Sequence, residues 1–173
     1  MKLNLGSGDM IKEGYINYDA MMWHRGGRQT DVIGRIEDIT KVYAENTFSE
    51  ILCAHVIEHF IAPEALKVLK DILWLLKPGG KAIIEGPDLL GMYDLYITQQ
   101  NNIHKLIEGI YPIVNVVKYG PEMNHRSGWT RELMGETMAG IGFEVVHVGK
   151  GMTHGFGMRD FRVEGVKPGK GAV

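Results

Sequence analysis

Two glycines and an aspartate near the start of the chain have the types and spacing of a nucleotide-binding turn. Gly6 and Gly8 flank a serine directly after residues 2–5, which have the pattern of a short buried strand, and Asp19 follows Gly8 by 11 residues. Glycine has no Cβ, so such a turn lets a ligand approach the backbone. An aspartate at the tip of the next strand can accept hydrogen bonds from ribose hydroxyls, each worth about 1.5–3 kcal/mol. The alternative interpretations are a tight turn and a capping aspartate.

A second group of polar residues could move a proton. His55, Glu58 and His59 follow one another closely, and His125 comes much later. Because unperturbed histidine titrates near pH 6.5, His55 and His125 are candidate bases. Glu58 and His59 also have a structural interpretation, in which they tie a strand to its neighbours. The pattern His-x-x-Glu-His binds zinc in one metalloprotease class, but there the ligands share a helix face and here His55 ends a strand, so we expect no metal.

The elements that carry these residues begin with short apolar strands. The patterns predict strands at residues 2–5, 15–20, 31–34 and 50–55. A parallel crossover with its helix usually takes at least about 10–12 residues, more than the first connection offers, so we expect a stunted crossover with one helical turn at residues 10–13. Residues 21–30, rich in glycine, are predicted to be a loop.

A strand, helix and strand follow in the middle of the chain. Ala65, Leu69, Ile72 and Leu76 form one apolar stripe, which predicts a helix over residues 63–77. A proline suits its first turn, and Pro-Gly-Gly ends it. Residues 81–86 are the next strand.

The second half is less regular at first. We expect helices at residues 89–99 and 103–110 and then a loop, so residues 88–128 are a candidate lid or substrate-side insertion. Thr130 is a plausible N-cap for the next helix. Strands at residues 143–148 and 158–166 should be antiparallel, because their connection is too short for a helical crossover. The fold class is therefore α/β, a Rossmann-like three-layer sandwich whose mostly parallel sheet ends in an antiparallel hairpin.

Composition places further bounds on function. The 173 residues are expected to form one domain, residues 1–173, with 45% hydrophobic and 23% charged residues. A net charge of −2 without a basic run gives no support for nucleic-acid binding. The single cysteine, Cys53, and the lack of an apolar leader favour a cytoplasmic location. The apolar runs are shorter than the roughly 20 residues of a membrane helix.

Six segments, in order along nearly the whole chain, resemble the class I S-adenosylmethionine-dependent methyltransferases, and more narrowly their small, N-terminally truncated, type 11-like members. The segments are residues 3–8, 14–19, 36–38, 55–59, 76–81 and 140–144. The ordered set is specific for the fold and for cofactor binding, and it does not identify the methyl acceptor.

The resemblance implies S-adenosylmethionine as the cofactor and assigns its contacts by position. The turn would lie against the amino-acid end of the cofactor, the aspartate would bind the ribose, and the residues after the third strand would hold the adenine. The residues so implied are Asn4, Gly6, Ser7, Gly8, Asp19, Ile36, Glu37, Asp38 and His55. Arg35 stands where the family often has an acid, and Met10 replaces a third glycine, so one pocket wall is thinner.

The motifs and their spacing bear on three possible functions. Methyl transfer to a small-molecule acceptor follows from the resemblance, with His55 or His125 as an optional base. A nicotinamide-dependent dehydrogenase needs a third glycine at position 11, which is Ile11, and an acid about 20 residues away. A catalytically silent cofactor-binding protein or subunit is the remaining alternative, and an apolar patch beside the short crossover would indicate a partner or a homodimer.

Candidate acceptor contacts come from the loops of the second half. His125, Arg126 and Trp129 precede a helix, His154 lies in the last connection, and Asp88 follows a strand. Scattered surface residues are the alternative for the loop group, and a helix N-cap is the alternative for Asp88.

Overall fold

A seven-stranded sheet forms the frame of the computed structural model, which describes residues 1–153, 155 and 157–169. The strand order is β5-β2-β1-β6-β7-β9-β8, in which β9 is antiparallel to both of its neighbours and the other paired strands are parallel. The strands are β1 (Lys2–Leu5), β2 (Ile16–Asp19), β5 (Val32–Ile33), β6 (Phe48–Ala54), β7 (Leu76–Pro87), β8 (Glu144–Lys150) and β9 (Asp160–Val166). The mostly parallel α/β sheet and its C-terminal hairpin, expected from the sequence, are confirmed.

Helices connect these strands and extend beyond them. The helices are α1 (Ile39–Val42), α2 (Ala62–Leu75), α3 (Leu89–Tyr93), α4 (Ile103–Ile110), α5 (Ile113–Tyr119) and α6 (Arg131–Ile141). Single 3-10 turns η1 (Ile36–Asp38), η2 (Ile57–His59) and η4 (Pro121–Met123) join them, and α3 continues as a π-helical segment, η3 (Asp94–Gln99). Among the described residues, no helix combines the length and the apolar character that crossing a membrane requires.

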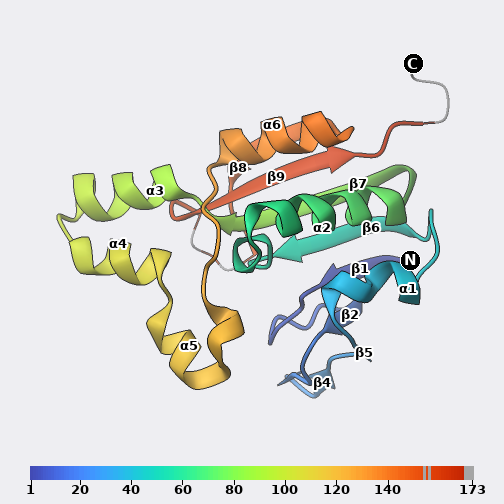
Figure 1. The fold of residues 1–173 in the computed structure, drawn as a ribbon, viewed down its shortest axis with the longest axis horizontal. Helices are drawn as coiled ribbons and strands as arrows, with labels where there is room; N and C mark the ends of the chain where they lie inside the picture. Colours follow the sequence, from blue (N-terminus) through green and yellow to red (C-terminus); the bar gives the residue numbers. More distant parts are fainter. Residues whose placement is uncertain (154, 156, 170–173) are drawn as a thin grey trace.

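The main core lies between the sheet and the helices α1, α2 and α6. In Figure 1 α2 and α6 lie side by side over the sheet, and α1 packs next to α2. Helix α2 buries Ala65, Leu69 and Ile72 completely, as its apolar stripe predicts. The Thr130 hydroxyl accepts a hydrogen bond from the Leu133 N–H at the start of α6, which confirms the predicted N-cap.

Ion pairs between neighbouring strands cover the opposite face of the sheet. Lys2 on β1 pairs with Glu50 on β6, Lys81 on β7 pairs with Glu164 on β9, and Arg162 on β9 reaches the buried Glu85 on β7 at 2.6 Å. Side chains of residues i and i+2 share one face of a strand, so these ions form one polar surface. Beside the short first crossover, the described residues of this face of the sheet therefore include several charged pairs.

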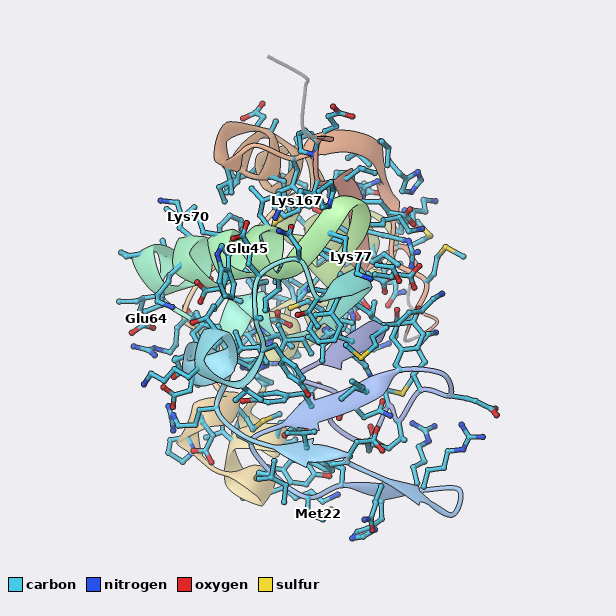
Figure 2. The ribbon with its side chains drawn as sticks, turned by 90° about the vertical axis from the view of Figure 1, so that its right-hand side faces the viewer. Met22, Glu45, Glu64, Lys70, Lys77 and Lys167 are labelled. Carbon is cyan, nitrogen blue, oxygen red and sulfur yellow. The ribbon has the colours of Figure 1, made fainter. Side chains whose placement is uncertain are left out.

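In Figure 2 Lys167, which follows β9, lies next to Glu45. The Lys167 ammonium donates to the side-chain oxygen of Asn46 at 3.0 Å and lies 3.9 Å from the Glu45 carboxylate. Met22 lies at the far end of the molecule in this view. The C-terminal strand is thus anchored to the turn that precedes β6.

Three expectations for the connections were wrong. Residues 10–13 form no helical turn, and instead two buried amides hold this crossover: the Asn4 amide donates to the Met10 carbonyl at 2.9 Å, and the Asn17 side-chain oxygen accepts from the Lys12 N–H at 2.8 Å. Residues 21–30 contain a small hairpin, β3 (His24–Arg25) with β4 (Arg28–Gln29). The expected loop after α4 contains the helix α5.

Candidate functional site

The first turn connects β1 and β2 at the carboxyl edge of the sheet. Gly6 and Gly8 have positive φ angles of 67° and 50°, and a Cβ on Gly6 would lie 2.3 Å from a methyl group of Val56. The N–H groups of Gly6 and Ser7 both donate to the Tyr18 carbonyl, at 2.8 and 3.1 Å. Val56 fills the space where a Gly6 side chain would lie, whereas no atom lies within 4 Å of the Cβ position of Gly8, so the turn leaves room for a ligand at Gly8.

Asp19 ends β2 and fixes that turn from the other side. One carboxylate oxygen accepts the Gly8 N–H at 2.9 Å, and the other accepts the Met21 N–H at 2.9 Å and the Trp23 indole N–H at 3.0 Å. Each carboxylate oxygen has two lone-pair sites, so capacity for a ligand hydroxyl remains. The structure thus joins Gly8 and Asp19, the two residues that the spacing singled out.

The residues after β5 form a further wall. Ile36 and Glu37 line a cavity of about 560 Å³ together with Gly6, Gly8 and Asp19. Glu37 pairs with the exposed Arg35 at 2.7 Å, whereas Asp38 pairs with Lys41 and lies outside the lining. Of the two acids that the sequence left open for the adenine amine, the geometry favours Glu37.

His55 occupies the centre of a buried ionic network. It has a positive φ of 55°, uncommon for a residue other than glycine, and its backbone N–H donates to the Glu85 carbonyl at 2.9 Å. Its ring lies 3.1 Å from the Asp160 carboxylate and 3.2 Å from the Glu58 carboxylate. Burial alone would lower the pKa of His55, but the hydrogen bond with Asp160 and the negative charge of the nearby Glu58 outweigh it and raise the pKa to about 9. A cationic ring at neutral pH is a poor base.

His125 is brought against η2 by a long-range backbone pairing. The Glu58 carbonyl accepts the N–H groups of Arg126 and Ser127 at 2.7 and 3.1 Å, so the segment that carries His125 runs along η2. The His125 ring meets the His59 ring edge to face at 5.2 Å. Burial, the largest influence, lowers the pKa of His125, so its ring is neutral at pH 7.

Three hollows meet at these residues. A hollow of about 340 Å³ shares Gly6, Gly8 and Trp23 with the 560 Å³ cavity. Its floor includes His55 and His125, which also line a third hollow of about 390 Å³ under α4 and α5. The cavity beside β1 and β2 is thereby joined, through the second hollow, to the third. We name the second hollow the connecting hollow, and the third, which residues 94–119 cover, the chamber.

That chamber has a polar lining of mixed charge, with Lys105, Arg159 and Glu108 around Tyr96. Asn4, implied as a cofactor contact, lines the connecting hollow, although its amide is engaged with Met10 and Asn17.

Two residues offered for the acceptor have structural contacts. Trp129 is 6% exposed and belongs to the core. Asp88 is fully buried and accepts a hydrogen bond from Arg131 at 2.7 Å. It occupies the position before α3, as the N-cap alternative requires, but its side chain makes no capping bond. His154 lies outside the described residues.

The strand order, the glycine turn and the acidic residue at the end of β2 are those of α/β folds that bind nucleotides at the carboxyl ends of their parallel strands. A family model described as "Methyltransferase domain" matches residues 16–84. The chain has the fold of the class I S-adenosylmethionine-dependent methyltransferases, and the resemblance inferred from the sequence is confirmed.

Solved structures with this fold are similar over almost the whole chain. A SAM-dependent methyltransferase from Archaeoglobus fulgidus is 14% identical, with a TM-score of 0.65 over 96% of this chain and 85% of that one. The Burkholderia thailandensis 1,6-didemethyltoxoflavin-N1-methyltransferase, with 1,6-didemethyltoxoflavin and S-adenosylhomocysteine bound, is 13% identical, with a TM-score of 0.61 over 96% and 70%. A chain in the complex of the Haloferax volcanii Trm112 methyltransferase activator with a methyltransferase is 11% identical, with a TM-score of 0.61 over 96% and 81%. No curated protein sequence matches.

Proposed function

We propose that the protein transfers a methyl group from S-adenosylmethionine to a small-molecule acceptor. The observation that carries the proposal is the line of connected hollows, which leads from the Gly6–Asp19 edge to the chamber under α4 and α5. The family match and the fold support S-adenosylmethionine as the cofactor. A fit to this group is supported by the open space at Gly8, where no atom lies within 4 Å of the position a Cβ would take, and by the Asp19 carboxylate at the cavity wall.

Each protein group then has a physical task. The turn from Gly6 to Gly8 lies against the amino-acid end, Asp19 accepts a ribose hydroxyl, and Ile36 and Glu37 hold the adenine. The cofactor supplies a methyl group that its positive sulfur already activates. Alignment of the two reactants is then the main contribution of the protein, and good geometry contributes about 7–11 kcal/mol.

We propose that the residues that line the chamber under α4 and α5 bind the methyl acceptor. His125 lines both that chamber and the connecting hollow, so it is placed to contact an acceptor beside the cofactor. Tyr119 at the end of α5 meets Trp23 edge to face at 5.3 Å, which brings the insertion over the turn that Asp19 organises. Residues 88–128 are accordingly proposed to cover the acceptor.

Calorimetric titration with S-adenosylmethionine tests the cofactor site. Loss of the ribose bonds in Asp19→Ala should weaken binding about 10- to 100-fold, since a charge-assisted bond is worth about 1.5–3 kcal/mol. Asp71→Ala on α2, where Asp71 pairs with Lys67 on the same helix, is the matched control and should bind normally. Equal affinity of Asp19→Ala and the wild type would refute the ribose assignment.

Glu37→Gln and Asp38→Asn separate the two candidates for the adenine amine. Glu37 lines the cavity and Asp38 does not, so only the first substitution should weaken binding of the cofactor. A loss confined to Asp38→Asn would reverse the assignment.

The second candidate function is a catalytically silent subunit of the same fold. It is favoured by the apolar outer surface of α5, where Ile113, Val114 and Val117 are 62%, 63% and 82% exposed. One similar fold comes from a complex with an activator protein. Production of S-adenosylhomocysteine with any of a broad set of acceptors would exclude this candidate, whereas cofactor binding without turnover would favour it.

A further inference from the structure

Two histidines, His59 and His125, and the buried carboxylate of Glu58 line the connecting hollow. Glu58 and His59 come from η2, and His125 comes from the segment before α6. One ligand-forming atom of each residue lies within 4.8 Å of those of the other two. Ligands of a tetrahedral zinc ion lie about 3.4 Å apart when each bond is about 2.1 Å, so small side-chain rotations bring the three onto one ion.

The buried carboxylate in this group has an ion-pair partner, His55, on one side only. Glu58 is 3% exposed, and neither carboxylate oxygen has a hydrogen-bond partner of good geometry among the described residues. The ring of His55, 3.2 Å from one oxygen, supplies a positive charge on one side. Burying a carboxylate is costly unless it is paired or bound to a metal, so the other oxygen is available to a cation.

Both imidazoles are oriented by backbone carbonyls, as metal-bound histidines usually are. The Nδ1 atom of His59 lies 3.3 Å from the Asn124 carbonyl oxygen, and the His125 ring makes a hydrogen bond with the backbone of Ile110. A ring nitrogen that donates to a carbonyl leaves the other nitrogen unprotonated, with its lone pair free for a metal ion.

We propose that Glu58, His59 and His125 bind one divalent transition-metal ion, for which Zn²⁺ is the best match. Two imidazoles and one carboxylate form a ligand set of catalytic zinc sites, in which the fourth position stays open for a small molecule. The pattern His-x-x-Glu-His does not bind the ion as a unit, because His55 directly follows β6. His55 remains outside the set, and the long-range approach of His125 supplies the third ligand.

The function of such an ion rests on the proposed methyl transfer, although its binding does not. Because His59 and His125 both line the connecting hollow, an ion held between them would lie beside the path from cofactor to acceptor. Its open position would bind an acceptor oxygen or nitrogen, and hold that atom in place. The acceptor class that this favours is a small molecule with a metal-binding hydroxyl or amine.

Zinc binding by the full chain tests the site. After treatment with a chelator, the protein is titrated with Zn²⁺ by calorimetry, and the bound metal is counted by elemental analysis after dialysis. We expect one Zn²⁺ per chain, and a loss of affinity of at least about 10-fold in both His59→Ala and His125→Ala. His104→Ala and His147→Ala, which remove exposed histidines elsewhere, are the matched controls and should bind as the wild type does.

Two outcomes would overturn the proposal: substoichiometric zinc in the wild type, or unchanged affinity in His125→Ala. Thermal unfolding without metal checks that each variant folds, and Glu58→Gln, which keeps the side-chain shape, provides a second test if an alanine variant does not. Titration with S-adenosylmethionine is done in parallel. Failure to bind the cofactor would count against the proposed function and leave the zinc result standing.

Discussion

The backbone N–H of Gly8 donates to the carboxylate of Asp19 at 2.9 Å and so joins the tip of β2 to the turn after β1. The same carboxylate holds the Met21 amide and the Trp23 indole. The acid that is proposed to bind the ribose is therefore also the centre of the local structure. A substitution here changes both functions, so Asp19→Asn, which keeps one acceptor oxygen, should weaken cofactor binding less than Asp19→Ala.

Gly6→Ala should be more damaging than Gly8→Ala. Both glycines have positive φ, which costs a residue with a Cβ about 1–2 kcal/mol. At Gly6 the Cβ would also lie 2.3 Å from a methyl of Val56, whereas at Gly8 no atom lies within 4 Å. Urea denaturation should show the larger loss of stability for Gly6→Ala, and calorimetry should show a larger loss of S-adenosylmethionine affinity. Equal effects would mean that Val56 moves away without cost.

The first crossover should depend on one buried amide. The Asn17 side chain accepts from the Lys12 N–H at 2.8 Å and donates to the Asp31 carboxylate at 2.9 Å. Asn17→Ala leaves the Lys12 N–H without this partner and removes one of two donors to Asp31, which keeps the Asn17 backbone N–H, so the expected cost is about 1–3 kcal/mol in total. Chemical denaturation measures the loss, and Gln100→Ala at an exposed site is the control. A change below about 0.5 kcal/mol would show that water replaces the amide.

Arg131→Ala should destabilise the fold strongly, because Asp88 is fully buried and Arg131 donates to it at 2.7 Å. Removing one partner of a buried ion pair costs about 3–5 kcal/mol. The double variant Asp88→Asn, Arg131→Gln carries no unpaired charge and should recover part of that loss. A single variant as stable as the wild type in urea would show that the pair is not needed.

Local patterns were sufficient to predict much of the fold. The apolar stripe of α2, the Thr130 cap and the strand-length apolar run of β6 are properties of neighbouring residues, and each was confirmed. The pairing of Gly8 with Asp19 could be predicted as well. Parallel strands that follow one another place their ends at the same edge of the sheet.

Features that depend on distant residues could not be predicted in this way. The crossover after β1 forms no helix, because the side chains of Asn4 and Asn17 make hydrogen bonds with its backbone groups. Such a loop has no periodic sequence pattern from which it could be predicted. Nor does any local signal bring His125 next to His59, since the contact follows from the backbone pairing of the segments that carry them. The one feature of the sequence that could have indicated this pair is the presence of histidines in predicted loops of both halves of the chain.

The protein should lose stability in acid through Asp160, which is 2% exposed and lies 3.1 Å from the His55 ring. Burial alone would raise the pKa of Asp160, but the hydrogen bonds from His55 and Arg159 outweigh it and lower the pKa. A carboxylate with a lowered native pKa stabilises the fold above its unfolded pKa of about 3.9, and that stabilisation is lost as the pH falls through the native value.

Asp160→Asn removes this titration and tests its contribution. At pH 7 the variant should be less stable than the wild type, because the charge next to His55 and Arg159 is lost. As the pH falls below about 4, the difference in free energy of unfolding should shrink, since the wild-type carboxyl becomes protonated as well. Urea denaturation at several pH values between 3 and 7 measures the difference. A constant difference across this range would mean that the native pKa of Asp160 is not lowered, and that its contribution to the fold is a hydrogen bond that does not depend on its charge.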